Sequence, residues 1–139
     1  MEKHIVYIQY LRSGVSMSRD IKFRVYDKKL KRMLGVQKHS FKTKKSMPYG
    51  FNMEYDFGGI MQYTGLKDKN GKKVYEDDII KYSHKAVGTI LRKVRMKYGM
   101  WGIEGIVKGT QIPFANILES EYEVVGNIYE NPELLEGEK

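Results

Sequence analysis

The stretch from Ile60 to Tyr82, IMQYTGLKDKNGKKVYEDDIIKY, limits the fold of this chain more than any other segment. Short runs of β-branched and aromatic residues, separated by a glycine turn and an acidic corner, indicate three strands. Asn70-Gly71 predicts a type I′ hairpin turn between the first two strands, because both residues tolerate a positive φ. Glu76-Asp77-Asp78 predicts a turn before the third strand, in which the carboxylates accept backbone N–H groups.

The segment before this stretch also alternates apolar and polar residues with the period of a strand. Ile21, Phe23 and Val25 alternate with basic and polar residues, which predicts a hairpin over residues 21–36 with basic residues on one face and at the turn. Residues 37–59 are first polar and then rich in glycine and aromatic residues, and they predict a long loop with one short strand near Phe51–Phe57.

The segment after it predicts further strands and a short helix. Residues 89–98 and 100–107 alternate around Gly99, which indicates an antiparallel pair with Met96 and Tyr98 pointing inward. Residues 112–118 predict either a single helical turn or an irregular crossover, and residues 121–129 the last strand. Asn131-Pro132-Glu133 is typical of a helix start. The fold class is therefore mainly β: a small, strongly bent antiparallel sheet or an SH3-like, partly open barrel, with a hairpin extension and a short C-terminal helix.

The length of 139 residues predicts one domain over residues 21–139, either undivided or with two lobes at 21–59 and 60–139. Residues 1–20 differ from the rest and form an N-terminal extension. One interpretation is a strand within residues 5–10. The other is that natural translation begins at Met17, so that residues 1–16 are a translated leader without fixed structure.

Positive charge is concentrated in the first part of the chain. The first fifty residues carry 13 Lys/Arg and 3 Asp/Glu, whereas the remaining residues carry 12 and 14. A second basic run, without any acid, extends from Lys81 to Lys97. Such asymmetry is typical of proteins that bind a polyanion, and nucleic acid is the expected partner. The alternative is a lysine-rich composition that decorates solvated turns.

The candidate nucleic-acid contacts are the basic residues of three short segments. They are Lys28, Lys29, Lys31, Arg32, Lys42, Lys44, Lys45, Arg92, Lys93, Arg95 and Lys97. Lysines outnumber arginines here, which favours contact with phosphate over readout of base edges. Aromatic residues either stack on bases or form the core of a small β-domain; Tyr26, Tyr63, Tyr82 and Trp101 are candidates for both, and for Trp101 we expect the core.

The sequence patterns of enzymes and cofactor sites are not found. The chain has no cysteine, its three histidines are far apart, and no phosphate-binding glycine motif occurs. The segment from Asp68 to Ile79 lacks the Gly and Glu positions of a calcium loop. Glu76 and Asp78 would form an acid/base pair without a nearby nucleophile, so we expect a structural turn at Glu76, Asp77 and Asp78.

These observations predict a non-enzymatic protein without a cofactor or bound metal. No run approaches the roughly 20 apolar residues of a membrane-spanning helix, so no membrane partner is expected. Cysteine-free composition fits a location in the cytoplasm.

Three blocks of the sequence resemble the YopX family of phage and prophage proteins. The blocks are IKFRVYDKKLKRML (Ile21–Leu34), MQYTGLKDKNGKKVYEDDIIKY (Met61–Tyr82) and YEVVGNIYENPELL (Tyr122–Leu135), in the order and spacing of that family. The resemblance implies a mostly β fold with barrel-like parts, a phage or prophage origin, a cytoplasmic setting and no established biochemical function. It supplies no catalytic residues.

Two departures from the family pattern matter. The family usually has Glu-Gly-Asp where this chain has Glu76-Asp77-Asp78, and Asp77 would take a positive φ there at modest cost. The family also tends to begin near Ile21, which supports a separate status for residues 1–16.

Three functional hypotheses follow from these observations. The first is a phage accessory binding module that contacts nucleic acid through a basic strand face. The second is a protein–protein interaction module acting on a host or phage protein, through the acidic corner or the glycine-rich aromatic loop. The third is a metal-dependent hydrolase or nuclease using Glu76 and Asp78.

Overall fold

The computed structural model describes residues 20–40, 45–48, 57–86 and 88–137. Their strands are β1 (Phe23–Asp27), β2 (Arg32–Ser40), β3 (Lys45–Pro48), β4 (Phe57–Lys67), β5 (Lys73–Tyr75), β6 (Asp78–His84), β7 (Gly88–Lys97), β8 (Met100–Glu104), β9 (Gln111–Pro113) and β10 (Tyr122–Asn127). Three short 3₁₀ turns are η1 (Phe114–Asn116), η2 (Glu119–Glu121) and η3 (Pro132–Leu135). The expectations for residues 1–19, and most of the strand predicted near residues 51–57, lie outside the described residues.

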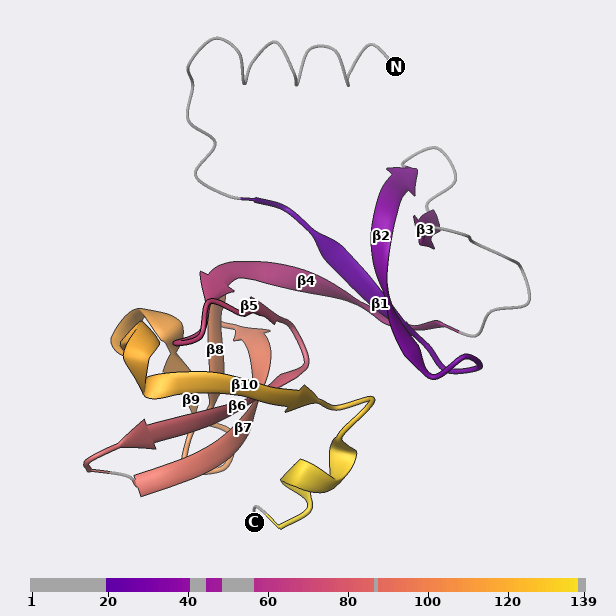
Figure 1. Cartoon of the computed structure of the whole chain (residues 1–139). Coiled ribbons are helices and arrows are strands. Elements are labelled where there is room, and N and C mark those ends of the chain that lie inside the picture. Colours follow the sequence, from indigo (N-terminus) through magenta and orange to yellow (C-terminus); the bar gives the residue numbers. More distant parts are fainter. Residues whose placement is uncertain (1–19, 41–44, 49–56, 87, 138–139) are drawn as a thin grey trace, which may run out of the picture.

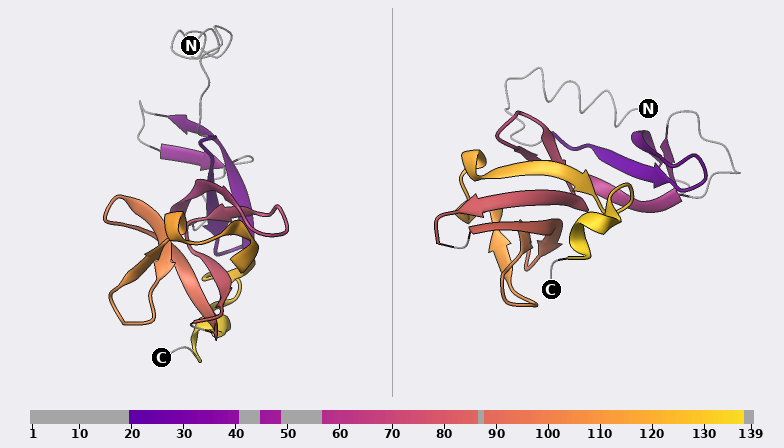
Figure 2. Two further views of the ribbon diagram at one scale, coloured as in Figure 1. Left: turned by 90° about the vertical axis from the view of Figure 1, so that its left-hand side faces the viewer. Right: turned by 60° about the horizontal axis from the view of Figure 1, so that its bottom comes forward.

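The strands form two antiparallel sheets of five strands each (Figure 1). The first has the order β3-β2-β1-β4-β5 and the second the order β10-β6-β7-β8-β9. Figure 2 shows the sheets as neighbours, the first in indigo to magenta and the second in pink to yellow. The chain passes from the first sheet to the second between β5 and β6; the expected division into lobes stays a prediction.

The second sheet curls around the main hydrophobic core. Alternate residues of its central strands, such as Ile80, Val94 and Ile103, are fully buried on its concave side. Val74 of β5 and Phe114 of η1 close this core from the ends. Burying such side chains stabilises the fold by roughly 1.5–3 kcal/mol each. The predicted mainly β fold with a bent, partly open barrel is confirmed.

The two glycine turns differ from what the sequence predicts. Asn70-Gly71 is not a type I′ turn, because only Gly71, at 78°, has a positive φ in the loop between β4 and β5. Lys67 pairs with Lys73 across this loop, and the Gly71 N–H donates to the Asp68 oxygen at 2.9 Å. The type I′ geometry occurs instead at Tyr98-Gly99, where φ is 54° and 73° and Lys97 pairs directly with Met100.

A buried carboxylate explains the longer turn. Asp68 is fully buried, and its side chain accepts hydrogen bonds from the backbone N–H groups of Asn70 (2.9 Å), Lys72 (2.9 Å) and Val124 (2.8 Å). The first two bonds shape the β4–β5 loop, and the third fixes that loop to β10. The turn is therefore determined by a tertiary contact with a strand more than fifty residues away.

The predicted C-terminal helix is a single 3₁₀ turn, η3. Pro132 starts it as expected, but Asn131 does not cap it with its side chain. Its Oδ1 instead accepts the N–H of Asn127 at 3.3 Å. Gly126 makes this possible, because a Cβ at that position would lie 2.5 Å from the Asn131 Oδ1.

Candidate functional site

The basic residues of β7 alternate along a strand that only partly lies inside the second sheet. β6 pairs with β7 as far as Lys93, whereas β8 pairs with it from Val94 to Lys97. The outer half of β7 and the start of β8 therefore project beyond β6 as a two-stranded hairpin. Lys93, Arg95 and Lys97 share one side of β7 by strand alternation, and we call these three residues the β7 basic face.

Two cations of the β7 basic face bind backbone carbonyl groups of the loop between β8 and β9. The Arg95 Nη2 donates to the Thr110 oxygen at 2.9 Å, and the Lys97 Nζ donates to the Gly109 oxygen. The same loop is closed by a hydrogen bond from the Gly105 N–H to the Thr110 oxygen, 2.9 Å long. Carbonyl partners orient the two cations without neutralising them, and neither has a carboxylate partner among the described residues.

The other two basic residues of β7 have different surroundings. Lys93 lies 3.8 Å from the Asp77 carboxylate, which partly compensates its charge. Arg92 lies on the opposite side of the strand by alternation, as predicted from the sequence, and donates to the carbonyl oxygens of Leu91 (2.9 Å) and Gly105 (3.5 Å). Positive charge that a ligand can reach is thus strongest toward Arg95 and Lys97.

The remaining candidate contacts lie on the first sheet or outside the described residues. Exposed cations follow β1 at the turn into β2, namely Lys28, Lys29, Lys31 and Arg32. Lys45 belongs to β3, where only its backbone is described, and Lys42 and Lys44 lie outside the described residues. In Figure 1, β1 and β2 lie on the right and β7 at the lower left, so the two described basic clusters belong to different parts of the molecule.

The tip of the β7–β8 hairpin carries an exposed apolar group that the sequence pattern did not reveal. Alternation predicts Met96 and Tyr98 inward, but they are 46% and 76% exposed, as is Met100 at 44%. The prediction was wrong because the hairpin extends past β6 and its tip has no core to cover. The feature that could have indicated this exposure is the greater length of β7 compared with β6.

A half-open pocket of about 650 Å³ lies next to the β7 basic face. Its wall is partly aliphatic and partly cationic, and only one acidic side chain lines it. The lining residues are Leu91, Arg92, Lys93, Glu104, Gly105, Ile106, Lys108, Ile128 and Leu135. Such a wall suits an apolar group that carries a negative charge nearby.

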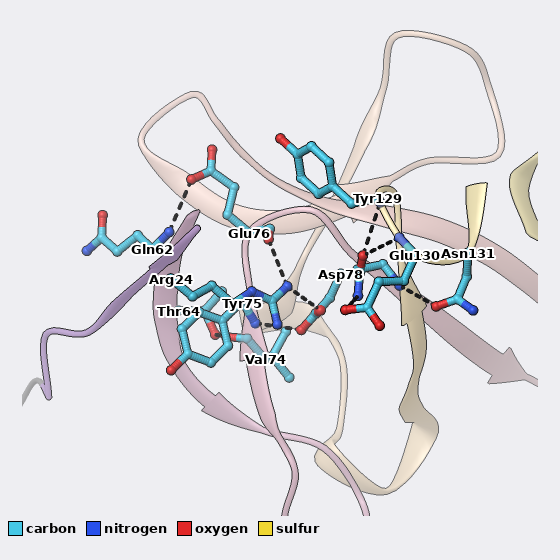
Figure 3. Close-up of polar contacts among 11 residues, drawn as sticks. Arg24, Gln62, Thr64, Val74, Tyr75, Glu76, Asp78, Tyr129, Glu130 and Asn131 are labelled. Atoms are coloured by element: carbon cyan, nitrogen blue, oxygen red, sulfur yellow. Dashed lines mark hydrogen bonds and ion pairs between the residues drawn. The ribbon is translucent and has the colours of Figure 1, made fainter. Parts of the chain in front are cut away.

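The acidic corner is occupied by contacts within the protein (Figure 3). The Asp78 carboxylate is 2% exposed, pairs with the Arg24 Nη2 at 2.6 Å, and accepts the Tyr75 N–H at 2.8 Å. Glu76 accepts the Gln62 N–H at 3.4 Å. Burial raises the pKa of Asp78, and the nearby Arg24 opposes that rise. Both carboxylates thus accept backbone N–H groups, and that of Asp78 is also paired with a cation. The structural role of Glu76, Asp77 and Asp78 stays a prediction.

Three of the four aromatic candidates for base stacking belong to the interior. Tyr26, Tyr63 and Tyr82 are buried. Trp101 is partly buried and packs against the core, as we expected. Among the aromatic residues that the structure describes, only Tyr98 is strongly exposed, at 76%.

The described residues contain no group of three or more His, Asp or Glu side chains that could hold a metal ion. Among them there is also no helix with the length and apolar character needed to cross a membrane. That the protein is not an enzyme stays a prediction.

A family model described as YopX protein matches residues 22–136. The chain belongs to the YopX family. The YopX likeness extends to solved structures: protein EF1440 from Enterococcus faecalis has a TM-score of 0.58 and 28% identity over 85% of this chain and 99% of that one. YopX from Bacillus subtilis has a TM-score of 0.51 and 20% identity over 83% of this chain and 98% of its own, which shows a shared fold. No curated protein matches the chain.

The backbone of Asp77, at the acidic corner, connects two segments that are far apart in the chain. Asp77 has a φ of 65°, the positive value that we expected from the sequence. Its N–H donates to the Val94 oxygen at 3.0 Å, and its own oxygen accepts the Ile128 N–H at 3.0 Å. The corner thus links β7 to the C-terminal segment, and an aspartate in a left-handed conformation maintains this link.

Proposed function

We propose that this YopX-family protein is a non-enzymatic binding module of phage or prophage origin that contacts the phosphates of nucleic acid through the β7 basic face. The single observation that supports this most is the state of Arg95 and Lys97. Their cations are held in place by neutral carbonyl groups, so their formal charge remains available to an anion. Oriented cations of this kind favour phosphate because little side-chain entropy is lost on binding.

Overall charge supports the same proposal. The chain has a formal net charge of +8 at pH 7, which favours association with a polyanion. The exposed cations of the β1–β2 turn would contribute additional, longer-range attraction. A cytoplasmic location in the host cell, where nucleic acid is accessible, is part of this proposal.

Removing the two oriented charges is expected to change the salt dependence of binding. In the double variant Arg95→Gln/Lys97→Gln, the negative slope of log K against log salt should become shallower by about 1.4 for a single strand or about 1.8 for a duplex, because two phosphate contacts are lost. Fluorescence anisotropy with labelled oligonucleotides over a series of salt concentrations measures this slope.

Lys67→Gln is the matched control for that experiment, because it removes one exposed positive charge from β4 of the first sheet. Its slope should stay close to that of the wild type. Absence of binding to either single or double strands at low salt would refute the proposal, and so would an unchanged slope in the double variant.

A second candidate function is the binding of a partner protein through the pocket beside the basic face. The observation that favours it is the combination of aliphatic and cationic lining residues, which suits an apolar side chain within an acidic segment. Ile106 lines the pocket and is 57% exposed, so Ile106→Glu should leave folding intact while repelling such a segment.

The expected result is capture of a host or phage protein from nuclease-treated lysate by the wild type, with at least a tenfold loss for Ile106→Glu. Leu118→Glu changes an equally apolar residue that is 68% exposed and does not line the pocket, and it should retain the partner. Equal capture by all three proteins would show that the pocket is not the contact site.

A further inference from the structure

The tip of the β7–β8 hairpin places an aromatic ring in solvent at a strained backbone position. Tyr98 is 76% exposed and has a φ of 54°, in the left-handed region that bulky residues avoid. The first position of a type I′ turn is normally occupied by asparagine, aspartate or glycine. Neither burial of the ring nor the backbone conformation therefore explains a tyrosine at this position.

The surroundings of the ring combine apolar and positive groups. Met96 and Met100 lie on either side of the turn and are both partly exposed. The Lys97 Nζ lies 5.0 Å from the centroid of the Tyr98 ring, where it makes a cation–π contact. Lys97 is also one of the two oriented cations of the basic face, so the ring and the phosphate-contacting charge are adjacent.

We propose that Tyr98 is a stacking platform for an unpaired base, so that the hairpin tip selects single-stranded over double-stranded nucleic acid. This inference rests on the proposed function and names the substrate class of the same site. In single strands each base offers a face to an aromatic side chain, whereas in a duplex that face is covered by the neighbouring pairs. Lys97 and Arg95 would contact the phosphates next to the stacked base.

Charge complementarity favours nucleic acid over a protein as the occupant of the tip. Lys97 adjoins the ring and Arg95 lies on the same side of β7 as Lys97, and neither cation is paired with a carboxylate among the described residues. An exposed aromatic residue next to such cations is the arrangement by which proteins bind single strands without sequence preference.

The variant Tyr98→Asn separates this role from a structural one, because stability and binding should change in opposite directions. Asparagine adopts the left-handed conformation readily, so the melting temperature should rise by a few degrees. Affinity for a short oligothymidine strand should fall roughly 5- to 150-fold, since stacking contributes about 1–3 kcal/mol per base. Affinity for a duplex of the same length should not change.

Two further measurements sharpen the test. Tyr98→Phe keeps the ring and should bind oligothymidine within about twofold of the wild type, since stacking needs the π-face and not the hydroxyl. The loss in Tyr98→Asn should be the same factor at every salt concentration, because stacking releases no counterions; the Arg95→Gln/Lys97→Gln variant should instead change the slope.

The outcomes distinguish this inference from the proposed function. If Tyr98→Asn binds oligothymidine as tightly as the wild type, while Arg95→Gln/Lys97→Gln makes the slope of log K against log salt shallower, the stacking role is refuted and the proposed function stands. If the wild type binds neither strand nor duplex at low salt, both are refuted. If Tyr98→Asn instead abolishes capture of a protein from nuclease-treated lysate without changing oligothymidine affinity, the tip is a protein contact and the inference is overturned.

Discussion

Replacing Arg24 with methionine is expected to lower the free energy of unfolding by about 3–5 kcal/mol, because it leaves a buried carboxylate without its cation. Arg24 comes from β1 of the first sheet, and Asp78 begins β6 of the second. Their 2.6 Å contact therefore joins the two sheets, and Tyr75 stacks against the guanidinium with its ring centroid 4.4 Å away. Urea unfolding followed by circular dichroism measures the loss.

The control is Lys22→Met, one residue before β1. Lys22 forms a 2.8 Å ion pair with Asp20, but both side chains are well exposed, so its removal should cost less than about 1 kcal/mol. In the double variant Arg24→Met/Asp78→Asn a neutral amide replaces the buried carboxylate, and the loss of stability should be smaller than the sum of the single losses. Equal losses for Arg24→Met and Lys22→Met would contradict the role of the buried pair.

The loss of stability in Arg24→Met should change with pH in a definite direction. Burial already raises the pKa of Asp78, and removing Arg24 should raise it further. A carboxyl whose pKa is higher in the folded than in the unfolded state loses stability as the pH rises through the folded pKa. The difference in stability between wild type and variant should therefore be smallest in acid, where Asp78 is protonated in the variant, and should grow toward neutral pH.

Replacing Asp68 with alanine is expected to lower the free energy of unfolding by about 3–5 kcal/mol, since three backbone N–H groups lose their acceptor and each buried unsatisfied donor costs about 1–3 kcal/mol, less where water enters. These donors belong to Asn70, Lys72 and Val124, so the β4–β5 loop should also separate from β10. Hydrogen exchange of the Val124 amide, compared between wild type and variant, reports that separation directly.

Asp68→Asn tests whether the negative charge matters as well as the shape. One of the two side-chain oxygens becomes an NH₂ group that faces N–H donors, so we expect the free energy of unfolding to fall by about 1–3 kcal/mol. Asp20→Asn, at a residue with an exposed side chain, should be neutral within about 0.5 kcal/mol. If both asparagine variants are equally stable, the buried carboxylate is not the device that fixes the loop.

Acid should remove the contribution of Asp68 to the free energy of unfolding. Burial alone would raise the pKa of this carboxyl, but the hydrogen bonds from Val124, Lys72 and Asn70 outweigh it and hold the pKa below its usual value. A lowered folded pKa contributes stability above the unfolded pKa, and that contribution is lost as the pH falls through the folded pKa. The difference in the free energy of unfolding between wild type and Asp68→Asn should therefore decrease below about pH 4 and vanish in stronger acid.

Local patterns in the sequence predicted the strands well where a strand has one buried face. The strands predicted around Phe23 and Val25 and over residues 89–98 are present as β1 and β7. Ile21, which we expected on the same apolar face, lies before β1 and is 52% exposed. The single helical turn over Phe114–Asn116 and the proline start of η3 also follow from local chemistry. Family membership was likewise readable from three blocks of sequence.

Turn types and side-chain exposure at strand ends were decided by tertiary structure. Asn70-Gly71 has the residues of a type I′ turn, yet a carboxylate bonded to β10 shapes a five-residue loop between Lys67 and Lys73. Tyr98 has the wrong residue type for that turn and adopts it nevertheless, since the register of Lys97 with Met100 leaves only two residues to reverse the chain. The preference of a residue type for a local conformation is worth about 1 kcal/mol and is overridden by such register constraints.

The sequence by itself determined the fold class, the family and the list of positive residues, because periodicity and charge are properties of neighbours along the chain. Only the tertiary structure decided which of those charges are oriented by carbonyl groups, that Asp78 belongs to a buried pair with Arg24, and that Tyr98 points into solvent. Each of these depends on where one strand ends relative to another, and that relation is set by contacts between residues far apart in the chain.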